Sequence, residues 1–244
     1  MPSQTRGRRS GRRPMLGILM VVPALALAGC ASIEPDVGSL PAGSELVATS
    51  GAAMRSVTST HFVIDVRGPL AGVAIRHAEG DVDARGTARG SADVAESGRP
   101  TKVDFVLLNG SFYVQRQTGG YRKVAPTAAT DVFGLTSILN PNHGMARVVT
   151  SVSDPTTRDT ETMNGVDSYR ITGTVAQQHI APLVPGIRSD VRATVWLAVS
   201  DAHLPVRAEF AVPGPRAAKV DVSISKVNVP VTVTAPATRA AEQP

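Results

Sequence analysis

The chain of 244 residues contains a single cysteine, Cys30, and few aromatic side chains: one Trp, three Tyr and five Phe. A lone thiol excludes a disulfide within the chain, so an ordinary buried core must hold the fold together. That core has to be built mainly from Val, Leu, Ile, Ala and Met. Aliphatic walls around an unfilled space accept apolar guests. A filled core of the same residues is the commoner arrangement, and alternation alone does not decide between the two.

The usual signatures of catalysis are also missing. There is no Walker loop, dinucleotide fingerprint or G-x-S-x-G elbow, and no zinc-ligand spacing links the five histidines, His61, His77, His143, His179 and His203. Ser223 to Lys226 matches S-x-x-K by letters, but it lies in a strand pattern without the companion motifs. Asp81 and Asp83 share a strand face and could form a cation or glycosidase pair, although a solvated outer face is the simpler interpretation. We therefore expect neither an enzyme nor a cofactor nor a metal site.

Positive charge is concentrated at the amino terminus. Five arginines within residues 1–13 account for the whole formal net charge of +5, so the rest of the chain is nearly neutral. No basic cluster remains that would bind nucleic acid. An uncharged run from Met15 to Ala28 follows, shorter than the about 20 residues that span a bilayer. This layout predicts an export signal over residues 1–29.

The signal ends in Leu27-Ala28-Gly29-Cys30, which resembles the bacterial lipobox. That resemblance implies cleavage before Cys30 and a diacylglyceryl group on its thiol; a plain secretory signal with an incidental cysteine is the alternative. Arg12-Arg13 lacks the rest of a twin-arginine pattern. Residues 30–44, rich in Pro, Gly, Ser and acids after the cysteine, predict a lipidated residue with a flexible tether. We expect a protein held on the inner membrane by lipid and facing the periplasm.

Periodic sequence begins at residue 45 and continues to about residue 235, which we predict to be one domain, with a disordered tail at 236–244. Residues 45–58 have helical spacing behind a possible Ser44 cap. Residues 60–68 alternate as a half-buried strand, and residues 72–97 form either two strands turning near Gly86 or one bent strand pair. Strands on either side of Asn109-Gly110, and a short one after Gly119-Gly120, complete an antiparallel meander.

The middle of the chain changes period. Residues 130–140 and 143–151 predict two short helices separated by Asn140-Pro141, and residues 176–183 predict a third. The remaining segments have strand patterns, with a turn at Asn164-Gly165 and a possible last strand at 229–235. These elements predict an α+β fold: one large curved antiparallel sheet with short helices on a single face.

Several stretches in this order carry a family resemblance: "SILNPNHGMARVVTSV", "MNGVDSYRITGTV", "ATVWLAVSDAHLPVRAEF" and "VDVSISKVNVPVTVTAP". Together with the lipobox, they resemble the mycobacterial lipoprotein family that includes LppX, LprA, LprF and LprG. The resemblance covers about residues 45–235. It implies a half-barrel sheet of the LolA/LolB type whose concave side encloses a hydrophobic cavity. It also implies a carrier that moves acylated lipids, glycolipids or lipoglycans across the periplasm toward the outer envelope, with a possible transport partner.

For such a cavity, we predict two opposed walls. One is a strand face with Phe62, Ile64, Val66, Phe105 and Leu107, and the other comes from the helices with Leu135, Ile138, Leu139, Met145 and Val149. The opposite strand parity, with Val63, Val106 and Leu108, remains a competitor. A scaffold lipoprotein that binds protein partners without cargo is the alternative function.

Overall fold

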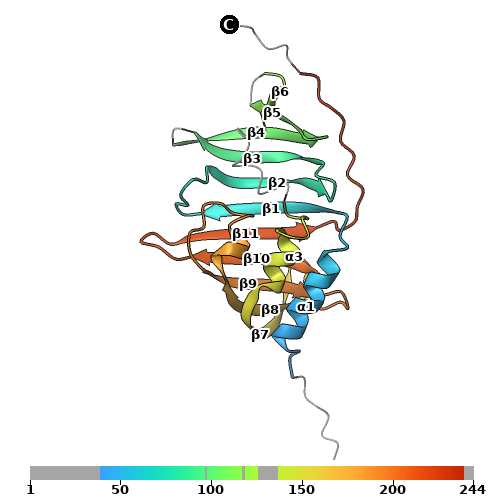
Figure 1. Ribbon diagram of the computed structural model, residues 1–244, viewed down its shortest axis with the longest axis vertical. Helices are drawn as coiled ribbons and strands as arrows, with labels where there is room; N and C mark the ends of the chain where they lie inside the picture. Colours follow the sequence, from blue (N-terminus) through green and yellow to red (C-terminus); the bar gives the residue numbers. More distant parts are fainter. Residues whose placement is uncertain (1–38, 97, 117–118, 126–136, 239–244) are drawn as a thin grey trace, which may run out of the picture. The chain divides into compact units, whose positions relative to one another are not determined.

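The computed structural model describes residues 39–96, 98–116, 119–125 and 137–238 (Figure 1). Cys30, the predicted signal over residues 1–29 and Leu135 lie outside these residues. The chain divides into two units at residues 38 and 39, and all of the described residues belong to the second unit.

In the described part of the chain, eleven strands form one antiparallel sheet. Their order across the sheet is β6-β5-β4-β3-β2-β1-β11-β10-β9-β8-β7, so the sheet does not close and β6 and β7 are its two edges. The bounds are β1 Ser59–Arg67, β2 Ile75–Asp83, β3 Ala88–Glu96, β4 Arg99–Leu108, β5 Ser111–Arg116, β6 Arg122–Val124, β7 Val152–Met163, β8 Val166–Val175, β9 Val191–Ala198, β10 Pro205–Val212 and β11 Ala218–Ser225. The predicted α+β class is therefore confirmed.

The described helices are α1 (Gly43–Met54), α3 (Met145–Thr150) and α4 (Gln177–Ile180). Figure 1 shows α1 and α3 lying over one side of the β7 to β11 half of the sheet. Leu46, Val47 and Met54 of α1 are buried there. Gly51 lets the two helices approach closely, since a Cβ atom at this position would lie 2.0 Å from Cγ2 of Thr150.

The four predicted helices all differ from the structure in their extent. Ser44 is not the cap of α1: the cap position is Ala42, with no side-chain hydrogen bond, and the helix ends at Met54. Residues 137–139 form a turn rather than the end of a helix, and the Asn140 side-chain oxygen accepts from the backbone N–H groups of Asn142 and His143. An Asx turn of this kind competes with helix formation at residues 137–140, whereas residues 130–136 of the predicted helix lie outside the described residues. The other two helices, α3 and α4, are real but shorter than predicted.

The predicted turns lie where expected. Asn109-Gly110 and Asn164-Gly165 both have left-handed backbone angles, with φ of 50° and 70° in the first pair and 53° and 79° in the second. These are the angles that a two-residue hairpin turn requires. Gly86, with φ of 83°, lies in the turn between β2 and β3, so the described part of the predicted segment forms two strands.

The segment after β11 does not form the predicted strand. Residues 229–238, here called the strap, run along the ends of the strands from β1 to β6 in extended form (Figure 1). Pro230 and Pro236 lack the N–H group that a strand ladder needs. Thr238 forms a single parallel bridge to Tyr121 beside β6. The predicted tail over residues 236–244 lies for the most part outside the described residues.

Candidate functional site

The strands turn one face toward the helices, and we call it the inner face. Cross-strand pairing places Ile64 opposite Val222 of β11 and Ala78 of β2. Further along the same face, Val66 lies opposite Val220, which in turn lies opposite Phe210 of β10. These residues join one hydrophobic core with side chains from α1 and α3.

The inner face contains a small apolar cavity beside β1, β10 and β11. Its volume is about 50 Å³. Every side chain on its wall is apolar, or absent in the case of glycine: Ile64, Val66, Gly72, Val73, Ile75, Ile138, Met145, Ile180, Leu183, Val184, Pro185, Phe210, Val220 and Val222. Such a wall offers neither a nucleophile nor a proton donor, so the cavity is suited to apolar contact alone.

Two connections cover one end of this cavity, and we call them the cover: residues 69–73 between β1 and β2, and residues 183–187 between α4 and β9. They touch at Gly186, where a Cβ atom would lie 2.6 Å from the carbonyl oxygen of Ala71 and 2.7 Å from Cγ2 of Val73. This close approach requires glycine at position 186. The cover is thus held by tight packing between two loops.

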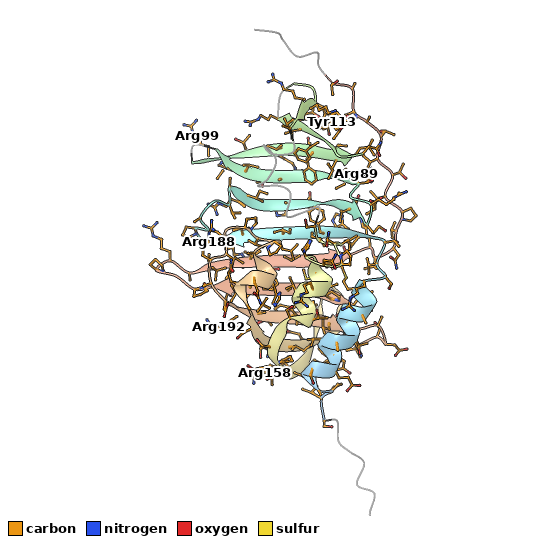
Figure 2. The ribbon with its side chains drawn as sticks, in the orientation of Figure 1. Arg89, Arg99, Tyr113, Arg158, Arg188 and Arg192 are labelled. Carbon is orange, nitrogen blue, oxygen red and sulfur yellow. The ribbon has the colours of Figure 1, made fainter. Side chains whose placement is uncertain are left out.

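A larger and more polar hollow of about 560 Å³ uses the same two connections. Arg188, Ser189 and Arg216 line it together with Pro69 and Leu70. Figure 2 shows Arg188 at this end of the strands, opposite the end where Arg89 lies. An apolar cavity and a cationic hollow therefore share one boundary.

The structure places the predicted cavity residues in three groups. Ile64, Val66, Ile138 and Met145 line the cavity. Phe62 and Val149 are fully buried in the core without reaching the cavity, and Leu139 packs against the core from its side. Leu135 lies outside the described residues.

Phe105 and Leu107 lie on the inner face but away from the cavity. Phe105 pairs with Gly90 of β3 and stacks on Phe112 of β5 with ring centroids 6.2 Å apart. Both residues of β4 are buried. Val63, Val106 and Leu108, which represent the opposite parity, alternate with these residues and point to the outer face.

Most of the wall that sequence reasoning missed comes from non-neighbouring segments. Phe210, Val220 and Val222 reach the cavity because β1 pairs with β11, the last strand of the sheet in chain order. The alternation in Ala218–Ser225 predicts a strand, but the sequence does not show that this strand pairs with β1. Ile180, Leu183 and Val184 belong to a short apolar segment whose docking the sequence pattern does not show.

Asp83, one of the polar candidates outside the cavity, has a structural role. Asp83 is buried, contrary to the expected solvated face, because its carboxylate accepts from the N–H groups of Arg85 and Thr87 in the β2–β3 turn. Among the described residues, no three His, Cys, Asp or Glu side chains gather where they could hold a metal ion. No described helix has the length and hydropathy needed to cross a membrane.

Comparison with known proteins places this geometry among lipoproteins. Residues 42–233 match the model of the LppX_LprAFG lipoprotein family. The chain is 30% identical over 226 residues to the lipoarabinomannan carrier protein LprG of Mycolicibacterium smegmatis, covering 90% of this chain and 94% of that protein. It is 28% identical over 207 residues to LprG of Mycobacterium tuberculosis, covering 83% and 87%.

Two solved structures share the fold. LprF from Mycobacterium bovis aligns with a TM-score of 0.71 and 25% identity, covering 80% of this chain and 97% of LprF. LppX from Mycobacterium tuberculosis aligns with a TM-score of 0.61 and 24% identity, covering 80% of this chain and all of LppX.

Proposed function

The chain belongs to the LppX_LprAFG lipoprotein family, and from this premise we propose that it binds the acyl chains of a lipid, glycolipid or lipoglycan and carries the cargo toward the outer envelope. The LprG relatives are named as carriers of lipoarabinomannan, which supports a cargo that combines acyl chains with a polar glycan. The observation that carries the proposal is the fully apolar wall of the inner-face cavity.

The gain from burying acyl chains is large enough for this role. Each CH₂ group removed from water contributes about 0.8 kcal/mol, so a chain of lipid length hardly enters water by itself. A protein cavity without polar side chains removes that barrier and needs no catalytic group. The proposed activity is therefore non-enzymatic binding and release.

The cavity must open before it can receive such a chain. Its about 50 Å³ is well below the ~150 Å³ of an apolar cavity that accepts benzene. The cover at residues 69–73 and 183–187 is the part that we expect to move, because two loops meet there at Gly186 and no strand ladder crosses the contact. Movement of the cover would join the cavity to the neighbouring hollow.

We place the polar part of the cargo in that hollow. Arg188, Ser189 and Arg216 supply donors for hydroxyl or phosphate oxygens at the boundary of the apolar cavity. The acyl chains would then lie between Ile64 and Val66 on one side and Ile138 and Met145 on the other.

Membrane attachment through Cys30 completes the proposal. One acyl chain gives marginal membrane binding, whereas two or more give stable anchoring, so a diacylglyceryl group on Cys30 would hold the protein on the inner membrane. The predicted tether over residues 31–44, whose last two residues form the start of α1, would then keep the domain within reach of periplasmic lipids. Release at the outer envelope requires a transport partner or the reach of the tether.

The test compares two neighbouring substitutions. Ile138→Trp fills the cavity, while Leu139→Trp changes a half-buried neighbour that does not line it. Lipid extracted from the purified protein and quantified by mass spectrometry should fall about tenfold or more in Ile138→Trp, because even a few excluded CH₂ groups remove that much affinity. Leu139→Trp should retain lipid.

Both variants are checked for folding by thermal melting. Equal lipid content in two folded variants would contradict the proposed site. Wild-type protein without extractable lipid, purified from cells that supply glycolipids, would contradict the carrier function itself.

A further inference from the structure

Another pocket lies on the other side of the sheet, under the strap. It has a volume of about 150 Å³, and we call it the strap pocket. Its wall consists of Thr60, His61, Asp81, Arg89, Lys226, Val229, Pro230 and Val231. Figure 2 shows Arg89 next to the strap, at the strand ends opposite Arg188. His61, Asp81 and Arg89 lie directly opposite one another on β1, β2 and β3.

The acid in this pocket already has two partners. The Asp81 carboxylate accepts from Nδ1 of His61 at 2.8 Å and from the Arg89 guanidinium at 3.2 Å and 3.3 Å. Burial raises the pKa of Asp81, but these hydrogen bonds and the Arg89 charge outweigh it, so its pKa lies below the usual value. Because an ionised carboxylate only accepts, Nδ1 of His61 carries a proton and its Nε2 is left for another contact.

Lys226, the other cation of the strap pocket, has no carboxylate partner among the described residues. Lys219 of β11, in contrast, is paired with Glu209. Lys226 has φ of 48°, a left-handed conformation that is uncommon for a residue with a long side chain. An unusual backbone angle of this kind is kept where the surrounding contacts determine it.

The turn that follows Lys226 is held by hydrogen bonds of Asn228 and Val229 to residues 58 and 59. Asn228, also left-handed with φ of 61°, accepts from the backbone N–H of Thr58 at 2.8 Å and donates its own N–H to the carbonyl of Ser59. The Ser59 hydroxyl donates to the carbonyl of Val229 at 2.6 Å. This turn fixes Lys226 on one wall of the pocket and Val229 on another.

We propose that the strap pocket binds an oxyanion of the phosphate type. Lys226 and Arg89 provide two cations and Asp81 one compensated anion, so the pocket has a formal excess of positive charge even with His61 neutral. Charge-assisted hydrogen bonds from lysine and arginine are the usual means by which proteins hold phosphate. At about 30 Å³ per water molecule, the volume equals that of a few waters and admits a group of phosphate size.

This site is independent of the carrier function. It lies on the face opposite the apolar cavity, and its residues come from the polar alternation of β1 to β3. The strap forms part of its wall, so a bound anion would hold residues 229–231 in place. The phosphate could belong to a lipid head group, as a diester, or to a free phosphate.

The experiment titrates the purified protein with inorganic phosphate and, separately, with dimethyl phosphate as a stand-in for a head-group diester. Binding is measured by calorimetry and by NMR shifts of backbone amides. We expect shifts confined to Thr60, His61 and Val231 and their neighbours. Lys226→Gln should weaken binding about tenfold, since one charge-assisted hydrogen bond is lost.

Lys102→Gln is the matched control, because Lys102 is exposed on β4 and does not line the pocket. Binding of both probes supports a site open to lipid head groups, and binding of inorganic phosphate alone supports a free-phosphate site. Binding of neither probe overturns the proposal. So does equal weakening in Lys102→Gln, which would show a general charge effect. Lys226→Gln should retain the lipid content of the wild-type protein, measured as for Ile138→Trp. The two proposals can therefore fail independently of each other.

Discussion

The two halves of the inner face differ in how their small and bulky side chains are arranged. From β8 to β11 the face carries bulky residues such as Ile171, Val195 and Phe210, and α1 and α3 lie over it (Figure 1). On β2 and β3 small residues predominate, with Ala78, Gly80, Ala88, Gly90 and Ala92 beside Val82 and Val94, and on β4 and β5 the bulky Phe105, Leu107 and Phe112 follow. Bulky residues anchor helices, whereas the small ones let a neighbouring aromatic ring lie flat: a Cβ atom at Gly90 would be 2.8 Å from Cζ of Phe105. The cavity lies near the junction of the two halves, beside β1 and β11.

The largest effect is expected in the small-residue half. In Gly90→Ala the new Cβ would lie 2.1 Å from the carbonyl oxygen of Glu79, which is backbone and cannot rotate away. We expect the free energy of unfolding to fall by about 4 kcal/mol, measured by urea denaturation. Gly214→Ala is the control, because its nearest neighbour would be 3.8 Å away. An unchanged free energy of unfolding in Gly90→Ala would mean that β2 and β3 can move apart without cost. The contrast between the two halves of the inner face would then be wrong.

A smaller loss is expected in the bulky half. Ile171 is fully buried on β8, and Ile171→Ala should lower the free energy of unfolding by about 3 kcal/mol. Ile64→Ala, beside the existing cavity, should cost less, because Ile64 is only partly buried. Chemical denaturation of both variants measures the difference. Equal losses would show that the cavity wall is packed as tightly as the covered core.

The smallest effect concerns the outer face. There, ion pairs tie strands in both halves: Asp81 with Arg89, and Asp221 with Arg207, whose guanidinium lies 4.9 Å from the centre of the Trp196 ring. Asp81 also accepts a hydrogen bond from His61. Since the pKa of Asp81 is lowered in the folded state, its ionised form stabilises the fold above the unfolded pKa of about 3.9. That contribution is lost as the pH falls through the lower, folded value.

Asp81→Asn should therefore cost about 1 kcal/mol at neutral pH, and the difference from wild type should shrink below about pH 3.9. Urea denaturation at a series of pH values measures this difference. A gap that stayed constant through the acid range would contradict the assigned ion pairs.

Local features of the fold could be predicted from the sequence, and pairings between distant segments could not. The Asn109-Gly110 and Asn164-Gly165 turns were predictable because few residues accept left-handed angles. The strap was mistaken for a strand because Val231 and Val233 alternate with threonines, although Pro230 and Pro236 exclude a full ladder. Ile64 and Val66 were found from alternation, whereas Phe210 and Val222 depend on the pairing of β1 with β11.

The pairing of β1 with β11 also affects how the chain folds. His61 lies opposite Ser225, so the β1–β11 pairing at the centre of the sheet forms only after residues as far as Ser225 have been synthesised. Pairings this distant in sequence are slow, and until they form, two half-sheets expose hydrogen-bonding edges to other chains. A delay in completing the carboxyl-terminal strands would therefore favour aggregation over folding, even with every residue of the cavity unchanged.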